Sequence, residues 1–123
     1  MAFLEEIETV IRSAYFEIVK KQAPLSKQGT TELNCGSYAY ITKEIKKIII
    51  ECNRQGLDVL STTNKIIYEF INKNYFIYSN HVMAVFIGYQ YLKRMAQIKH
   101  QFSINGINNN STLADIANHT LTW

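Results

Sequence analysis

A chain of 123 residues is long enough for a domain with a buried core, and 47% hydrophobic against 19% charged residues is typical of folded proteins. This balance excludes an intrinsically disordered chain, and a net charge of +3 is too small to require nucleic-acid binding. We therefore expect one helical domain over residues 1–123. The abundance of Ile, Asn, Lys, Tyr and Phe suggests a gene of AT-rich microbial or mobile-element origin.

Hydrophobic periodicity predicts the first two helices. Apolar residues recur every three or four positions from Phe3, which predicts a helix from about Ala2 to Gln22 that ends before Pro24, the only proline. Pro24–Ser37 is rich in glycine and small polar residues and is expected to form a loop. A second apolar stripe predicts a helix from about Tyr38 to Gln55. The residues expected to face water on this helix are Lys43, Glu44, Lys46, Lys47 and Glu51.

The segment after Gln55 is expected to hold two more main helices. Gly56 predicts a left-handed helix stop, and a third helix should run from Asp58 or Ser61 to Asn72, with Asp58, Ser61 and Thr62 as candidate caps. The fourth should run from Asn80 to about Phe102, capped by Ser79 or Asn80, and its apolar first half predicts a central position. Its small residues Ala84 and Gly88 would let a neighbouring backbone approach, and a homodimer would form through this face or through the aromatic side of the helix.

The fold predicted from these elements is all-α: a compact bundle of four main helices with a short C-terminal helix. Thr112 and Asp115 stand at capping-box spacing, so this last helix is expected from Ser111 to about Leu121. Trp123 would then dock on the core of its own chain or serve as an exposed anchor for a partner.

Charge is distributed unevenly along the chain and indicates a candidate contact surface. The opposite charges balance up to Glu69, and no carboxylate follows until Asp115. Much of this acid-free stretch is expected to be core and therefore unavailable to a partner. The candidate contact surface is then limited to the end of the fourth helix and nearby tyrosines. The predicted contact residues are Lys93, Arg94, Lys99 and His100, with Tyr78 and Tyr91 as aromatic anchors.

Arg94 and His100 stand with five residues between them, a spacing that resembles the Arg-x4–6-His motif of the HEPN ribonucleases. The resemblance covers these seven residues and the helical class. It implies an all-α domain that dimerises to bring two motifs together and cleaves RNA without a metal. Under this resemblance Arg94 would steady the phosphate and His100 would transfer protons near neutral pH.

No other motif in the sequence predicts a catalytic or metal site. The sequence lacks CxxC, HExxH, P-loop and dinucleotide-binding patterns, so we expect no metal and no cofactor. Two cysteines, Cys35 and Cys52, without a signal-peptide pattern favour reduced thiols in the cytoplasm, and no apolar stretch predicts a membrane span. Cys52 lies on an apolar stripe and is expected to be a core residue.

These observations favour a non-enzymatic cytoplasmic binding protein, such as an inhibitor, immunity factor or adaptor, whose partner is another protein. An RNA-directed protein, either a HEPN-like ribonuclease or a simple RNA binder, is the second hypothesis. A structural subunit of a larger assembly is the third. A homodimer is expected in addition, because the fourth helix carries more apolar faces than one neighbouring helix would cover.

Overall fold

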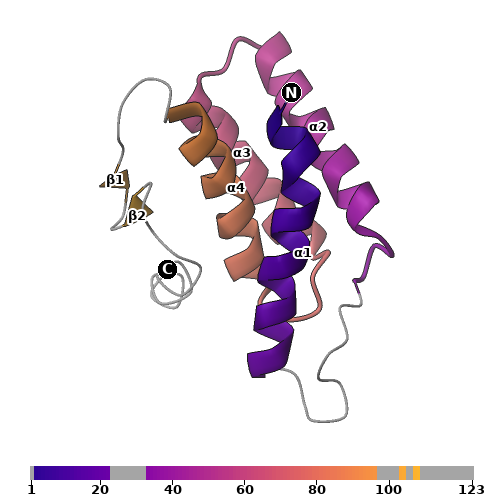
Figure 1. The fold of residues 1–123 in the computed structure, drawn as a ribbon. Coiled ribbons are helices and arrows are strands. Elements are labelled where there is room, and N and C mark those ends of the chain that lie inside the picture. Colours follow the sequence, from indigo (N-terminus) through magenta and orange to yellow (C-terminus); the bar gives the residue numbers. More distant parts are fainter. Residues whose placement is uncertain (1, 23–32, 97–102, 105–106, 109–123) are drawn as a thin grey trace.

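The computed structural model describes residues 2–22, 33–96, 103–104 and 107–108. Within these residues four helices form a compact bundle, which confirms the predicted all-α fold (Figure 1). The helices are α1 (Ala2–Gln22), α2 (Tyr38–Arg54), α3 (Val59–Lys73) and α4 (Asn80–Ala96). Two short strands that the sequence did not predict, β1 (Ser103–Ile104) and β2 (Ile107–Asn108), pair in antiparallel register.

Several predicted features lie outside the described residues. These are the part of the predicted fourth helix after Ala96, the helix expected over Ser111–Leu121, Trp123, and most of the loop expected over Pro24–Ser37.

Capping side chains set the starts of α2 and α3. The Ser37 hydroxyl accepts a hydrogen bond of 3.1 Å from the Tyr40 N–H, and the Asp58 carboxylate accepts one of 2.7 Å from the Ser61 N–H. Asp58 is therefore the cap among the three candidates for α3. Gly56 has a φ of +74°, and the Leu57 N–H donates to the Cys52 carbonyl at 3.0 Å, which confirms the predicted stop of the second helix.

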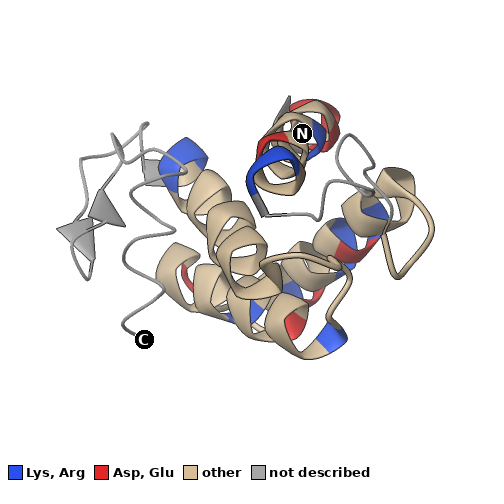
Figure 2. Cartoon of the chain, turned by 90° about the horizontal axis from the view of Figure 1, so that it is seen from below, with Lys and Arg blue, Asp and Glu red and all other residues tan. Residues whose placement is uncertain are grey.

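The core is built around α4. Every residue from Val82 to Tyr89 is buried, because α3 and α1 both pack against this helix. The predicted central position of its apolar half is therefore confirmed. The described length of α4 is tan in Figure 2 except for blue at its end, where Lys93 and Arg94 stand.

Gly88 lets α3 approach α4 closely. A Cβ at this position would meet the side chain of Ile67 and lie 3.3 Å from the Thr63 carbonyl oxygen. The predicted close approach is therefore made by α3 of the same chain. Ala84 is fully buried as well, so the proposal that this face forms a homodimer surface is wrong: it lies inside one chain.

The chain just before α2 is attached to the connection between α3 and α4. Leu33 forms an antiparallel bridge with Phe76, and the Asn34 N–H donates to the Tyr75 carbonyl at 2.9 Å. The Asn34 side chain also donates to the Asn74 carbonyl at 2.7 Å. These bonds bring the first turn of α2 next to Tyr75, which positions the surface described below.

Candidate interaction surface

Arg94, the centre of the predicted contact surface, is paired within the chain. Its Nη1 donates to a carboxylate oxygen of Glu6 at 3.1 Å, which joins α4 to the first turns of α1. Both side chains are substantially exposed, so the pair contributes about 0.2–1 kcal/mol to stability. It places a carboxylate beside Arg94 at this end of α4. Lys93 lies beside it and is partly exposed, whereas Lys99 and His100 lie outside the described residues.

The two predicted aromatic anchors do not join Arg94 on one surface. Tyr91 is only 4% exposed and packs edge-on against Phe3 with ring centroids 5.7 Å apart, so its prediction as a surface anchor is wrong. Tyr91 falls on the same buried side of α4 as the core residues one turn earlier. Tyr78 precedes α4, and its N–H donates to the Tyr15 hydroxyl at 3.1 Å. By helix rise it lies about 24 Å from Arg94.

A different surface runs along the outside of α2. It consists of Tyr40, Lys43, Lys47, Ile50 and Arg54, which we call the α2 stripe. All five are exposed, and the two uncharged members are 43% (Tyr40) and 55% (Ile50) exposed. A shallow hollow of about 460 Å³ runs beside the stripe, lined by Tyr40, Lys43, Glu44, Lys46, Lys47 and Ile50.

The sequence identified the lysines of this surface but missed its apolar members. Lys43, Lys46 and Lys47 were expected to face water, and the structure confirms that they are exposed. Tyr40 and Ile50 were missed because each lies next to a residue of the buried stripe. The helical period could have shown that they are exposed. Tyr40 and Ile50 lie three or four positions from the lysines, and therefore on the same side of the helix, whereas Ile41, Ile45 and Ile49 form the buried side.

The charges of the α2 stripe are only partly balanced. Lys47 pairs with Glu44 at 3.4 Å, and Arg54 pairs with Glu51 at 2.7 Å. The hydrogen bonds from Arg54 and Gln55 hold the pKa of the Glu51 carboxyl below its ordinary value. Lys43 and Lys46 have no acidic partner among the residues that the structure describes. The stripe therefore presents an excess of positive charge.

Tyr40 is held in place by the core. Its ring stands edge-on to Tyr75 with centroids 5.8 Å apart, and Tyr75 in turn stands edge-on to Phe70 at 5.5 Å. Burial, the nearby Glu44 charge and the hydrogen bond to Tyr40 raise the pKa of the Tyr75 hydroxyl. The exposed ring of Tyr40 thus has a fixed position, which lowers the entropy lost when a partner packs on it.

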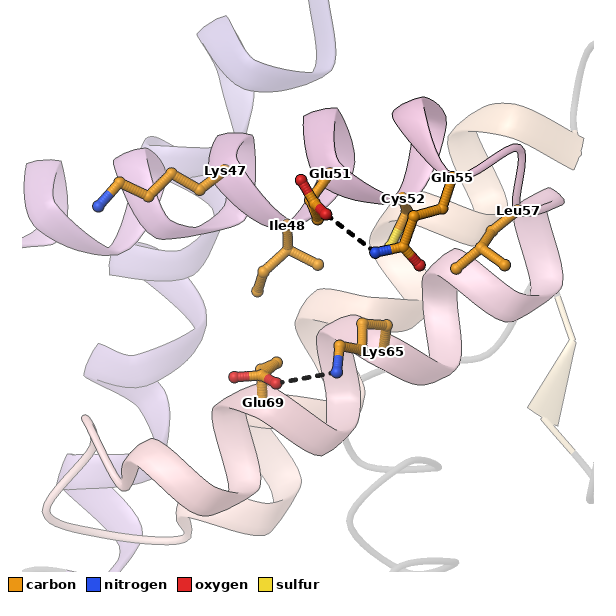
Figure 3. Close-up of a pocket in the computed structure, with 8 residues that line it drawn as sticks. All are labelled: Lys47, Ile48, Glu51, Cys52, Gln55, Leu57, Lys65 and Glu69. Atoms are coloured by element: carbon orange, nitrogen blue, oxygen red, sulfur yellow. Dashed lines mark hydrogen bonds and ion pairs between the residues drawn. The ribbon is translucent and has the colours of Figure 1, made fainter.

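A second hollow of about 460 Å³ lies between α2 and α3 (Figure 3). Ile48, Cys52 and Leu57 provide its apolar surface. Its polar side chains are hydrogen-bonded within their own helices: Gln55 donates to Glu51 at 2.9 Å along α2, and Lys65 pairs with Glu69 at 3.2 Å along α3 (Figure 3). Lys47 lines both this hollow and the hollow beside the α2 stripe, so the two hollows are neighbours on the surface of α2.

The cysteines and other titratable groups in the described residues do not form a recognisable catalytic or metal site. Cys52 is buried as expected, and the thiol of Cys35 donates to the Ser37 carbonyl at 3.6 Å. No group of three or more His, Cys, Asp or Glu side chains there could hold a metal ion.

Across the described segments, every helix is too short or too polar to span a bilayer. No protein-family model, no curated protein and no solved structure matches the chain.

Proposed function

We propose that this chain is a non-enzymatic cytoplasmic protein that acts by binding another protein through the α2 stripe. The observation that carries the proposal is the pair of exposed apolar side chains, Tyr40 and Ile50, set among cations on one line of α2. Tyrosine and arginine are enriched among the residues that carry most of the binding energy of protein interfaces, and apolar side chains are buried when such an interface forms. An inhibitor, immunity factor or adaptor would act by occupying its partner in this way.

This proposal moves the expected contact surface from α4 to α2. Tyr91 is buried, and Tyr78 precedes the start of α4 whereas Arg94 lies in its last turn, so these residues do not form one surface. The RNA-directed alternative depends on Arg94 together with His100, and it stays the second hypothesis.

Site-specific photocrosslinking in cells of the natural source tests the proposal. A photoreactive residue replaces Ile50, and in a matched control it replaces Val10, an exposed apolar residue of α1. We expect a discrete protein adduct from position 50, absent from position 10 and lost when Tyr40→Ala is added. Equal adducts from both positions, or none from position 50, would contradict the proposal.

Incubation with labelled RNA tests the alternative. The wild-type chain is compared with Arg94→Ala and His100→Ala. We expect no cleavage by any of the three proteins. Cleavage by the wild type that is lost in both variants would establish a ribonuclease and overturn the non-enzymatic proposal.

A further inference from the structure

The α2 stripe also indicates what kind of partner it fits, an inference that rests on the proposed function. We propose that the contacting element of the partner is an α-helix that carries acidic and apolar side chains and lies along the stripe.

The spacing of the stripe matches one side of a helix pair. Its members follow each other at intervals of three, four, three and four residues from Tyr40 to Arg54. This is the alternation that keeps side chains on one line of a helix facing a second helix. At the rise of an α-helix the line is about 21 Å long, enough for a partner helix of about four turns. A shallow hollow beside the line leaves room for the partner's side chains.

The charge of the stripe selects an acidic partner. Three of its five members are cations, and Lys46 adds a fourth positive charge on one flank. Lys43 and Lys46 are not paired with any acid within the described residues, so acidic groups of a partner would gain these interactions without breaking an existing ion pair. Tyr40 and Ile50, near the two ends of the line, would receive the partner's apolar side chains.

A second copy of this chain fits the stripe less well. With a twofold axis parallel to α2, Lys43, Lys47 and Arg54 would each face themselves, and with a perpendicular axis two surfaces of net positive charge would still face each other. A partner of opposite charge avoids this repulsion.

A nucleic acid also fits less well than an acidic helix. Glu44 and Glu51 lie on the flank of the stripe that borders α3, where they line the hollows between these helices. A phosphate backbone lying along the stripe would approach both carboxylates, whereas a helix can place neutral or basic side chains opposite them. Because carboxylates lie beside the cations of the stripe, a protein helix is favoured over a nucleic acid as the partner.

Binding of designed peptides to the intact chain tests the inference. The probe is a fluorescent 21-residue helical peptide of glutamate, leucine and alanine with its leucines on one face. Two matched peptides replace either every glutamate by lysine or every leucine by alanine. We expect only the acidic peptide with leucines to bind, and we expect its binding to weaken as salt rises.

Charge reversal locates the binding site. The variant Lys43→Glu with Lys46→Glu should weaken binding by at least about tenfold, and Ile50→Ala should weaken it by about as much. The matched control is Lys20→Glu with Lys21→Glu, which makes the same charge change at exposed positions of α1 and should leave binding within about twofold. An equal loss in both charge-reversal variants would show attraction to the net charge only, and would overturn the inference.

Two further results would overturn the inference. The first is tighter binding of single-stranded RNA than of the acidic peptide, with the same sensitivity to Lys43→Glu and Lys46→Glu. The second is no binding of the peptide although the crosslink at position 50 still captures its protein. In the second case the proposed function stands, and only the inference that the partner contributes an acidic helix is wrong. Peptide binding without any crosslink in cells would instead count against the proposed function.

Discussion

The side chain of Ile67 in α3 fills the space that a Cβ would occupy at Gly88 in α4. A Cβ added there would lie 2.9 Å from the Ile67 Cδ1 atom and 3.3 Å from the Thr63 carbonyl oxygen. The backbone oxygen cannot move aside as a side chain can. Glycine is therefore required at this crossing by the close approach of the two helices, although it costs helix propensity.

Gly88→Ala should lower the free energy of unfolding by about 1–3 kcal/mol, because the added methyl group overpacks the α3–α4 contact. Helix propensity alone predicts the opposite sign, a gain of about 1 kcal/mol. Urea unfolding followed by circular dichroism distinguishes the two. In the Ile67→Ala background the same substitution should cost less, since the methyl group then has room. A stabilising Gly88→Ala would contradict the packing described here.

The neighbouring residues Ile49 and Ile50 should respond in opposite ways to truncation. Ile49 is 2% exposed, so Ile49→Ala should cost about 2–5 kcal/mol through lost burial and a residual cavity. Ile50 is 55% exposed, so Ile50→Ala should change stability by no more than about 0.5 kcal/mol. Chemical denaturation of the two variants measures this. A large cost at Ile50 would mean that its side chain belongs to the core and would remove it from the α2 stripe.

Asn80 should be important for stability, because its amide joins the end of α3 to the start of α4. Its Nδ2 donates to the Phe70 and Ile71 carbonyls at 3.0 and 3.3 Å, and its Oδ1 accepts from the Phe76 N–H at 3.2 Å. Asn80→Ala removes all three bonds and should cost about 1–3 kcal/mol in thermal or urea unfolding. Asn72→Ala, at an exposed position of α3, is the control and should be nearly neutral.

Alkaline pH should destabilise the fold through its buried tyrosines. Burial raises the pKa of the Tyr15, Tyr89 and Tyr91 hydroxyls above the ordinary value of 10.0. The folded chain therefore favours the neutral phenols. Their stabilising contribution is fully present below the unfolded pKa of about 10 and is lost as the pH rises through the folded pKa values.

Unfolding free energies measured from about pH 8 to pH 12 should therefore fall steeply above about pH 10. Phenolate absorbance should rise together with unfolding for the buried rings. Tyr91→Phe should flatten the pH dependence, whereas Tyr68→Phe, at a ring that is 60% exposed, is the control and should not. A profile that is the same for Tyr91→Phe and the wild type would contradict this explanation.

The positions of the helices along the chain were predictable, because helix starts and stops depend on local sequence. The spacing of apolar residues gave α1 its observed bounds, Ala2–Gln22, and placed the start of α2 at Tyr38. The turn at Gly56 and the cap at Asp58 were predictable for the same reason, since each involves residues within one turn of a helix. The pair β1–β2 was not predicted, because strands of two residues are too short to show a periodic pattern.

The spacing along α2 could have shown which residues face outward, but the contacts that pair or hold the exposed side chains could not be predicted, because they join residues distant in sequence. The pairing of Arg94 with Glu6 and the edge-on contact of Tyr40 with Tyr75 both join separate helices or connections, and no local pattern encodes either. For Tyr91 the error was to expect an exposed side chain where the structure buries one. A tyrosine beside basic residues has the composition of a contact site, but its burial is decided by the angle at which α4 packs against α1.

The bonds that join the chain before α2 to the chain after α3 make a closed loop of this part of the molecule. Asn34 and Asn74, which are hydrogen-bonded, are 40 positions apart, and the whole of α2 and α3 lies between them. These bonds hold the start of α2 beside the end of α3. Neither of these helix ends can therefore separate from the bundle without breaking the bonds from Asn34. In amide hydrogen exchange we therefore expect α2 and α3 to open as one cooperative unit, and a ligand on α2 to slow exchange in both helices.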